Sequence, residues 1–300
     1  MYSLIQAYVN IMFSAYSRSI HDLSGYESGP VMFDLINAFY QKVDELNVDW
    51  EAKGFIFGDK TVYSINHDTK LLGRIFEILT EPILQEIANE NGYCLETPGQ
   101  QNYYPDFTLS PIGESGNKIA VDVKTTYRSY NSNGDVKPYS FTLGSYASFL
   151  RNNTKNIAYS YDQYSKHYVI GFVYDRNDAA QSSVRVSIDN LCESPSPYLN
   201  LEFFIQEKYK IAGFTPGSGN TENIGTASSS SIEMFKNGTG PFSEMGNDVF
   251  EFYWRNYPRY RAPEKLYTNK ETFFLWVEND DNCPECIREH VTHYLTPIGD

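Results

Sequence analysis

Cysteine is scarce in this chain, with 4 copies among 300 residues. So few cysteines cannot build the disulfide framework of a small secreted domain, and the count favours a reducing cytoplasm. Long apolar runs are lacking too, because no stretch approaches the ~20 apolar residues that a membrane-spanning helix needs. Residues 1–20 do not have the layout of a signal peptide, since their first basic residue is Arg18 and polar residues interrupt the apolar ones. We therefore expect a cytoplasmic protein with no membrane partner.

Positive charge is also in short supply, since 24 Lys and Arg face 38 Asp and Glu, for a net charge of −14. A protein that neutralises DNA phosphates usually carries a basic surface, so this balance counts against DNA binding. The charge is uneven, however, because residues 118–176 hold eight Lys or Arg against four Asp or Glu. This segment predicts a locally basic cleft in an acidic body, and the alternative is scattered charge on a solvated surface.

Apolar residues make up 41% of the chain, which is typical of a packed globular fold rather than of a disordered chain. A chain of this length forms one large domain or two small ones, and we favour one α/β domain. The spacing of apolar residues predicts helices at Phe33–Leu46, Asp68–Asn91, Ser145–Asn153 and Ser243–Asn256, an extended run at Lys53–Tyr63, and strands at Lys118–Tyr127, His167–Tyr174 and Asn200–Phe204. The strand at His167–Tyr174 is almost continuously apolar, so we expect it to be central in the sheet.

The motif that carries chemistry is Asp106, in a Tyr-Pro-Asp-Phe run, followed by Asp122 and Lys124 in the next apolar segment. Side chains alternate along a strand, so Asp122 and Lys124 share one face. Asp106 reaches them from the neighbouring strand of a hairpin whose loop is Ser110–Asn117. Two converging carboxylates and the carbonyl oxygen of Val123 make an all-oxygen site suited to Mg²⁺. Lys124 then contacts the scissile phosphate and helps to orient or deprotonate the attacking water.

An Asp-x-Lys string is common, and by itself it describes a surface ion pair on an amphipathic strand. Three further features favour a nuclease: the Pro-Asp pair at hairpin distance, the polarity of the strand, and a preceding helix that carries Glu77.

Six stretches of the chain, in order, resemble the EcoRV family of type II restriction endonucleases, within the PD-(D/E)xK nuclease superfamily. They are Ile75–Glu77, Gln100–Phe107, Ile119–Tyr127, Arg151–Asn156, Gly217–Gly225 and Trp254–Tyr257. The resemblance implies a restriction-endonuclease-like fold, with a central mixed β-sheet flanked by helices, and a homodimer that holds double-stranded DNA in a U-shaped cleft. It also implies Mg²⁺-dependent blunt cleavage at a palindrome, with GATATC as the target, and a cognate methyltransferase as genetic partner.

Carried over by position, the resemblance makes Asp106 and Asp122, with the Val123 carbonyl, the Mg²⁺ ligands. Glu77 becomes an auxiliary acid at the metal site, and Lys124 becomes the catalytic lysine. The implied DNA-binding residues are Gln101, Asn102, Thr125, Ser148, Lys155, Gly217, Ser218, Gly219, Asn220, Thr221 and Asn223.

The Gly-, Ser- and Asn-rich segment Gly213–Ser231 contains the stretch that matches the major-groove recognition loop of the family. There the Asn220 side chain reads base edges, and Thr221 touches a thymine methyl group. A floppy linker is the alternative, although so long a linker inside a domain is unusual. Two positions depart from the family pattern: Glu222 stands where the family has threonine, and Tyr103 stands where it has histidine.

The ends of the chain extend beyond the resemblance. We expect residues 1–31 to form a helical extension, residues 32–260 the endonuclease domain, and residues 261–300 an acidic extension. That last segment holds a cluster that predicts a zinc site, namely Cys283, Cys286, His290 and His293. The gap between the two ligand pairs is much shorter than in ordinary zinc fingers, and the alternative is an acidic tail with two free thiols.

The sequence thus predicts a type II restriction endonuclease, and two alternatives remain. One is a structure- or end-directed nuclease of the same superfamily. The other is a catalytically silent, sequence-specific DNA-binding protein. A binding module has no need of two carboxylates facing phosphate, so the intact Asp106 and Asp122 disfavour the silent protein.

Overall fold

The computed structural model of the chain describes residues 33–113, 116–217, 222–259, 261–281 and 283–295. The chain divides into two units, Met1–Asp34 and Leu35–Asp300, and the elements below belong to the second. The helical extension predicted for residues 1–31 lies outside the described residues.

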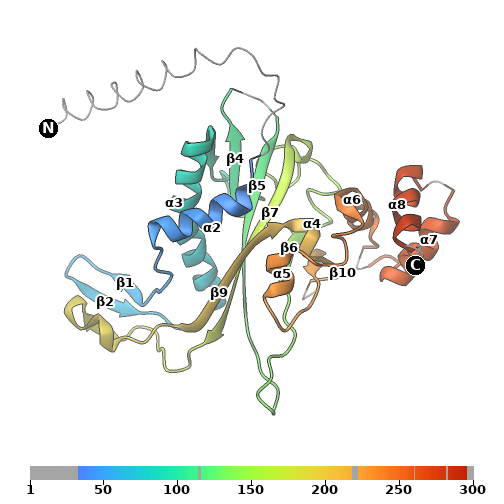
Figure 1. Cartoon of the computed structure of the whole chain (residues 1–300). Coiled ribbons are helices and arrows are strands. Elements are labelled where there is room, and N and C mark those ends of the chain that lie inside the picture. Colours follow the sequence, from blue (N-terminus) through green and yellow to red (C-terminus); the bar gives the residue numbers. More distant parts are fainter. Residues whose placement is uncertain (1–32, 114–115, 218–221, 260, 282, 296–300) are drawn as a thin grey trace. The chain divides into compact units, whose positions relative to one another are not determined.

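A five-stranded mixed sheet with the order β3-β4-β5-β7-β9 forms the centre of this unit (Figure 1). Neighbouring strands run antiparallel except for β5 and β7, which are parallel. Its strands are β3 (Tyr93–Glu96), β4 (Phe107–Pro111), β5 (Lys118–Tyr127), β7 (Tyr164–Arg176) and β9 (Tyr198–Glu207). The three predicted strands are therefore present. The middle position belongs to β5, while the more apolar β7 lies beside it in the interior of the sheet.

Both faces of β7 are buried, which explains its almost unbroken apolar sequence. On one face Phe172 stacks on Phe76 of a covering helix, with the ring centroids 4.4 Å apart. On the other face Val169 and Val173 join the large core cluster that also contains Phe204 of β9. Alternate side chains thus fill two different layers of the core.

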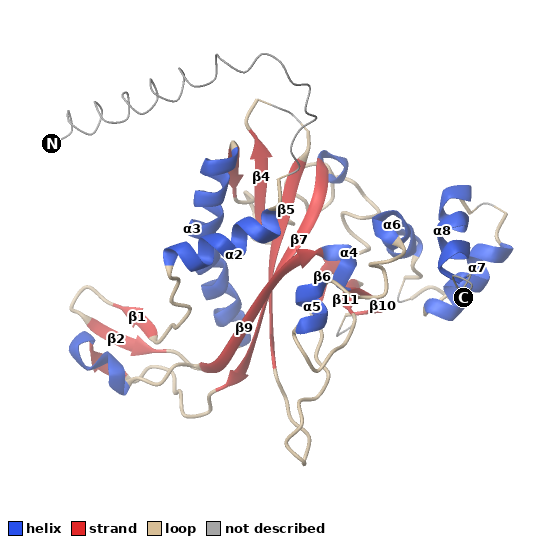
Figure 2. Cartoon of the chain, viewed as in Figure 1, coloured by secondary structure: helices blue, strands red, loops and turns tan. Residues whose placement is uncertain are grey.

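Two helices, α2 (Leu35–Leu46) and α3 (Thr69–Asn91), cover the first face of the sheet (Figure 2). Asp68 caps α3, because its carboxylate accepts hydrogen bonds from the backbone N–H groups of Lys70 and Leu71. Gly92 ends α3 in the left-handed conformation, with φ of 75°, which favours glycine. The helix continues through Pro82 without a break.

Two small sheets flank the central one, with the strand orders β1-β2-β8 and β10-β11-β6. Their strands are β1 (Gly54–Ile56), β2 (Thr61–Ser64), β8 (Arg185–Ser187), β10 (Ala212–Pro216), β11 (Asn223–Thr226) and β6 (Thr142–Ser145). The extended run predicted at Lys53–Tyr63 is therefore a hairpin. The remaining elements are η1 (Tyr161–Gln163), η2 (Ile188–Glu193), α4 (Lys208–Ile211), α5 (Glu233–Asn237), α6 (Gly246–Asn256), α7 (Lys270–Asn279) and α8 (Glu285–Leu295).

The helix predicted at Ser145–Asn153 is wrong, because this segment follows β6 as a series of turns. Its polar side chains bond to the backbone: the Ser148 hydroxyl donates to the Lys155 carbonyl oxygen at 2.9 Å, and Arg151 donates to the Arg255 carbonyl oxygen. Such bonds compete with a helix for the same groups.

The acidic C-terminal segment packs against the rest of the unit. Phe273 and Val277 of α7, with Ile287 and Val291 of α8, are buried in the same core cluster as Tyr253 of α6. No helix among the described residues is long and apolar enough to cross a bilayer.

Candidate active site

The β4–β5 hairpin places two carboxylates opposite each other. Phe107 pairs with Val121, so Asp106 at the start of β4 faces Asp122 on β5. The backbone N–H of Val123 donates a hydrogen bond to Asp106 Oδ2 at 2.7 Å, which fixes that carboxylate against the neighbouring strand. The convergence of Asp106 and Asp122 predicted from strand alternation and hairpin length is therefore present.

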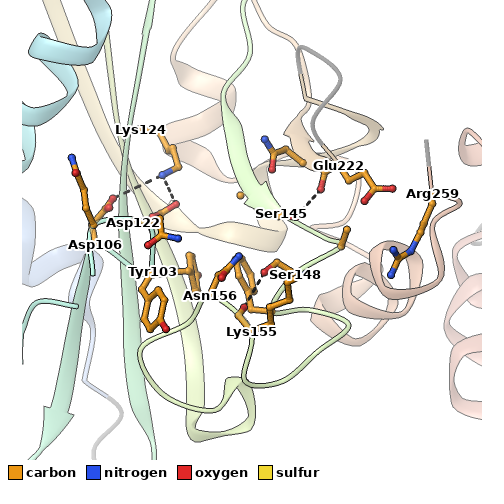
Figure 3. Close-up of a pocket in the computed structure, with 17 residues that line it drawn as sticks. Tyr103, Asp106, Asp122, Lys124, Ser145, Ser148, Lys155, Asn156, Glu222 and Arg259 are labelled. Carbon is orange, nitrogen blue, oxygen red and sulfur yellow. Dashed lines mark hydrogen bonds and ion pairs between the residues drawn. The ribbon is translucent and has the colours of Figure 1, made fainter. Parts of the chain in front are cut away.

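Lys124 lies among three oxygen atoms, and Figure 3 shows its contacts with Asp106 and Asp122. Its Nζ is 2.6 Å from Asp122 Oδ2 and 3.9 Å from Asp106 Oδ2. It also donates a hydrogen bond to the Val123 carbonyl oxygen at 3.2 Å. Asp122 is only 4% exposed, so its charge is compensated mainly within the protein.

The two carboxylates carry more negative charge than one ammonium neutralises. Burial and, after it, the charge of Asp122 raise the pKa of Asp106 to about 8, against the lowering effect of Lys124. Burial lowers the pKa of Lys124, but the nearby carboxylates outweigh it and hold that pKa above its ordinary value. Lys124 is therefore protonated in this arrangement, which suits contact with phosphate and does not suit acceptance of a proton from water.

The donor set fits a divalent cation. Asp106, Asp122 and the Val123 carbonyl oxygen already surround one cation, the ammonium of Lys124. These are hard oxygen donors, which Mg²⁺ prefers.

Glu77 lies on α3 near these carboxylates, and its charge helps to raise the pKa of Asp106. Its own carboxylate pairs with Arg74, with Nη1 and Oε2 2.6 Å apart. Among the described residues, no three Asp, Glu, His or Cys side chains form a metal-holding group, so Glu77 does not complete one with Asp106 and Asp122. Arg74 was not predicted, although its spacing of three residues from Glu77 on a helix is typical of such an ion pair.

A pocket of about 530 Å³ opens beside the carboxylates. The DNA-binding candidates that line it are Gln101, Asn102, Ser148, Lys155 and Asn223. Asn156 and Arg259 also line it and were not predicted. Of the basic residues within 118–176, only Lys124 and Lys155 line this pocket, so the expected basic cleft draws on few of them.

The remaining DNA-binding candidates lie elsewhere. Thr125 follows Lys124 on β5, and its hydroxyl faces Gly73 of α3 rather than the pocket. Gly217 lies at the end of β10, where its N–H donates to the Asn223 carbonyl oxygen at 2.8 Å. Ser218, Gly219, Asn220 and Thr221 lie outside the described residues.

The four zinc candidates do not converge in the described part of the chain. Cys283 is buried before α8, whereas Cys286 and His290 are exposed on that helix. His290 Nδ1 lies 2.6 Å from the Cys286 carbonyl oxygen, and His293 lies on the next turn.

The sequence model of the family described as Restriction endonuclease EcoRV matches residues 46–278, more than half of the chain. The chain belongs to this family. It is 43% identical over 246 residues to the type II restriction enzyme EcoRV of Escherichia coli, a match that covers 81% of this chain and 96% of the relative. Among solved structures, the NlaIV restriction endonuclease covers 89% of this chain and 92% of its own at 12% identity, but its TM-score of 0.37 is too low to carry an argument.

As a member of the EcoRV family, the chain is a type II restriction endonuclease, a deoxyribonuclease whose substrate is DNA. Enzymes of this family are typically Mg²⁺-dependent. The predicted family, fold class and enzyme class are confirmed.

Proposed function

We propose that this endonuclease is a cytoplasmic, Mg²⁺-dependent homodimer that cuts both strands of GATATC bluntly and leaves 5′-phosphate ends. The observation that carries the proposal is the convergence of Asp106, Asp122 and Lys124 at one pocket, in a chain of the EcoRV family. A methyltransferase that protects the same site would be its genetic partner.

In this proposal Asp106, Asp122 and the Val123 carbonyl oxygen hold Mg²⁺. The bound ion would polarise the scissile phosphate and lower the pKa of a water molecule at the site. Lys124 leaves its carboxylate partners and donates hydrogen bonds to the phosphate, where it stabilises the charge that develops during cleavage. Glu77, held by Arg74, adds negative charge on the α3 side of the site.

Target specificity would come from the β10–β11 hairpin. Gly217 and Asn223 pair across the base of its tip, which contains Asn220. A Cβ atom at Gly225 would lie 2.6 Å from the Thr215 carbonyl oxygen, so close pairing of this hairpin requires glycine there. Because Asn223 lines the same pocket as Asp122, this hairpin would read bases next to the cleavage site.

Digestion of plasmid DNA tests this function. With Mg²⁺, a plasmid that carries one GATATC site should become a single linear product whose sequenced ends are blunt and 5′-phosphorylated. Without Mg²⁺, or on a plasmid whose site is changed at one base pair, the DNA should stay uncut. A ladder of products would favour the structure- or end-directed nuclease, and binding without cutting would favour the silent DNA-binding protein.

The homodimer proposal is supported by exposed apolar side chains at the edge of the β1-β2-β8 sheet. Phe55 and Ile56 lie on opposite faces of the edge strand β1, Phe57 follows them, and each is about half exposed or more. Val184, next to β8, is exposed as well. Neighbouring exposed apolar side chains of this size mark an interaction surface, and a second copy of the chain is the occupant that reading a palindrome requires.

Replacing Ile56, which is 62% exposed, with aspartate should therefore convert the dimer to a monomer. Light scattering after size-exclusion chromatography should give about half the wild-type mass, and double-strand cleavage should fall with it. Ile112 is 66% exposed in the β4–β5 connection, so Ile112→Asp is the matched control and should stay dimeric. A wild-type protein that is monomeric at micromolar concentration and fully active would overturn the homodimer.

A further inference from the structure

Lys208 is a buried lysine next to the pocket that the proposed mechanism does not use. It begins α4 and is only 2% exposed. Its Nζ lies 4.6 Å from the ring centroid of Tyr104 and 5.1 Å from that of Phe149. Among the residues that the structure describes, it forms no ion pair with a carboxylate; Asp122 and Glu251 act on it only at longer range.

Burial of an ammonium without a carboxylate partner costs desolvation free energy, so its presence here suggests a role. The ammonium lies beside the stacked rings, almost equally far from both centroids, and cation–π attraction returns only part of the lost hydration energy. Burial lowers the pKa of Lys208 to about 8, while the charge of Asp122 acts in the opposite direction. At neutral pH the side chain therefore remains a cation within electrostatic reach of Asp122.

The residues around Lys208 connect the candidate active site with the β10–β11 hairpin. Tyr104 and Phe149 stack with ring centroids 4.2 Å apart, and both rings line the pocket. Tyr104 is two residues before Asp106, so the stacked pair adjoins the carboxylates. On the other side, α4 runs directly into β10, the first strand of the proposed recognition hairpin.

We propose that Lys208 is a positioning residue of the catalytic centre. Its fixed positive charge, placed beside the Tyr104–Phe149 stack, sets the electrostatic potential at Asp122. It favours the negative charge that develops on the phosphate during cleavage. The same charge opposes a divalent cation at Asp106 and Asp122, so the inference rests on the Mg²⁺ ligands assigned in the proposed function.

Lys208→Met tests this inference, because methionine keeps the packing and removes the charge. Isothermal titration of the DNA-free protein should show Mg²⁺ binding about threefold to tenfold tighter than in the wild type, since a repelling charge is gone. Single-turnover cleavage at saturating Mg²⁺ should nevertheless be slower by about tenfold or more. A merely structural role would not tighten metal binding while it slows cleavage.

Lys118→Met is the matched control. Lys118 is also a buried lysine, 6% exposed, whose Nζ lies 4.1 Å from the ring centroid of Tyr159, but Tyr159, unlike Tyr104 and Phe149, does not line the pocket. This variant should keep the wild-type Mg²⁺ affinity. Thermal unfolding checks that each variant is folded, and if Lys208→Met does not fold, Lys208→Gln takes its place with the same two expectations.

Unchanged Mg²⁺ affinity in the folded Lys208 variant would overturn the inference, and so would slower cleavage with weaker metal binding, which marks a packing role. Failure of the proposed function looks different. In that case the wild-type protein itself would neither bind Mg²⁺ nor cut GATATC, before any variant is compared.

Discussion

Replacing Asp122 with alanine should abolish cleavage while the protein stays folded. Asp122 is the most buried carboxylate of the site, and with Asp106 it forms the pair of acidic side chains that contacts Lys124 in the described pocket. Loss of a metal ligand should lower the single-turnover rate by about three orders of magnitude or more. Asp122→Asn, which keeps the shape and removes the charge, should be equally inactive. Asp162→Ala, at an exposed position of η1, is the control and should cut normally.

The same variant has a second readout in the pH dependence of stability. Burial and the charge of Asp122 raise the pKa of folded Asp106 to about 8 from an ordinary value of 3.8. A raised pKa of an acid stabilises the fold at low pH, and this stabilisation is lost as the pH rises from about 4 through 8. Metal-free Asp122→Ala should lose less stability over this range than the wild type in thermal unfolding. Substantial Mg²⁺-dependent cutting by the purified variant would refute the metal-ligand assignment.

Replacing Lys124 with methionine should also remove activity, and it should destabilise the metal-free fold. Without its ammonium the carboxylate pair loses its nearest cation, so the free energy of unfolding should fall by about 1–2 kcal/mol. Added Mg²⁺ should recover part of that loss, because it supplies the missing positive charge. The cleavage rate should fall by about three orders of magnitude, since the phosphate loses a charged hydrogen-bond donor.

Lys137→Met is the control for this variant, because Lys137 is an exposed lysine in the connection between β5 and β6. Its thermal midpoint and its cleavage rate should match those of the wild type. If Lys124→Met cuts GATATC within tenfold of the wild-type rate, Lys124 does not contact the reacting phosphate.

The catalytic hairpin was predictable because its geometry is local. Alternation along β5 placed Lys124 beside Asp122, and the short connection to β4 brought Asp106 opposite them. The ends of α3 were equally predictable, since Asp68 and Gly92 cap the helix through backbone groups within a few residues. Each of these predictions depends on chain geometry that holds in any surroundings.

The segment after β6 was predicted incorrectly because its structure depends on distant partners. Arg151 donates hydrogen bonds to the carbonyl oxygens of Arg255 and Tyr257, far along the chain. These bonds hold the turns that bring Ser148 and Lys155 to the pocket, so helical spacing within the segment was a poor guide.

The sequence by itself determined the chemistry of this protein: two carboxylates and a lysine on paired strands, and membership of a nuclease family. Only the tertiary structure decided the setting of that chemistry, including the turns that Arg151 holds after β6 and the burial of Lys208 beside Tyr104. The physical reason is the distance along the chain over which each effect acts. Strand alternation and hairpin closure act over a few residues, whereas burial and charge compensation depend on which remote segments the fold packs together.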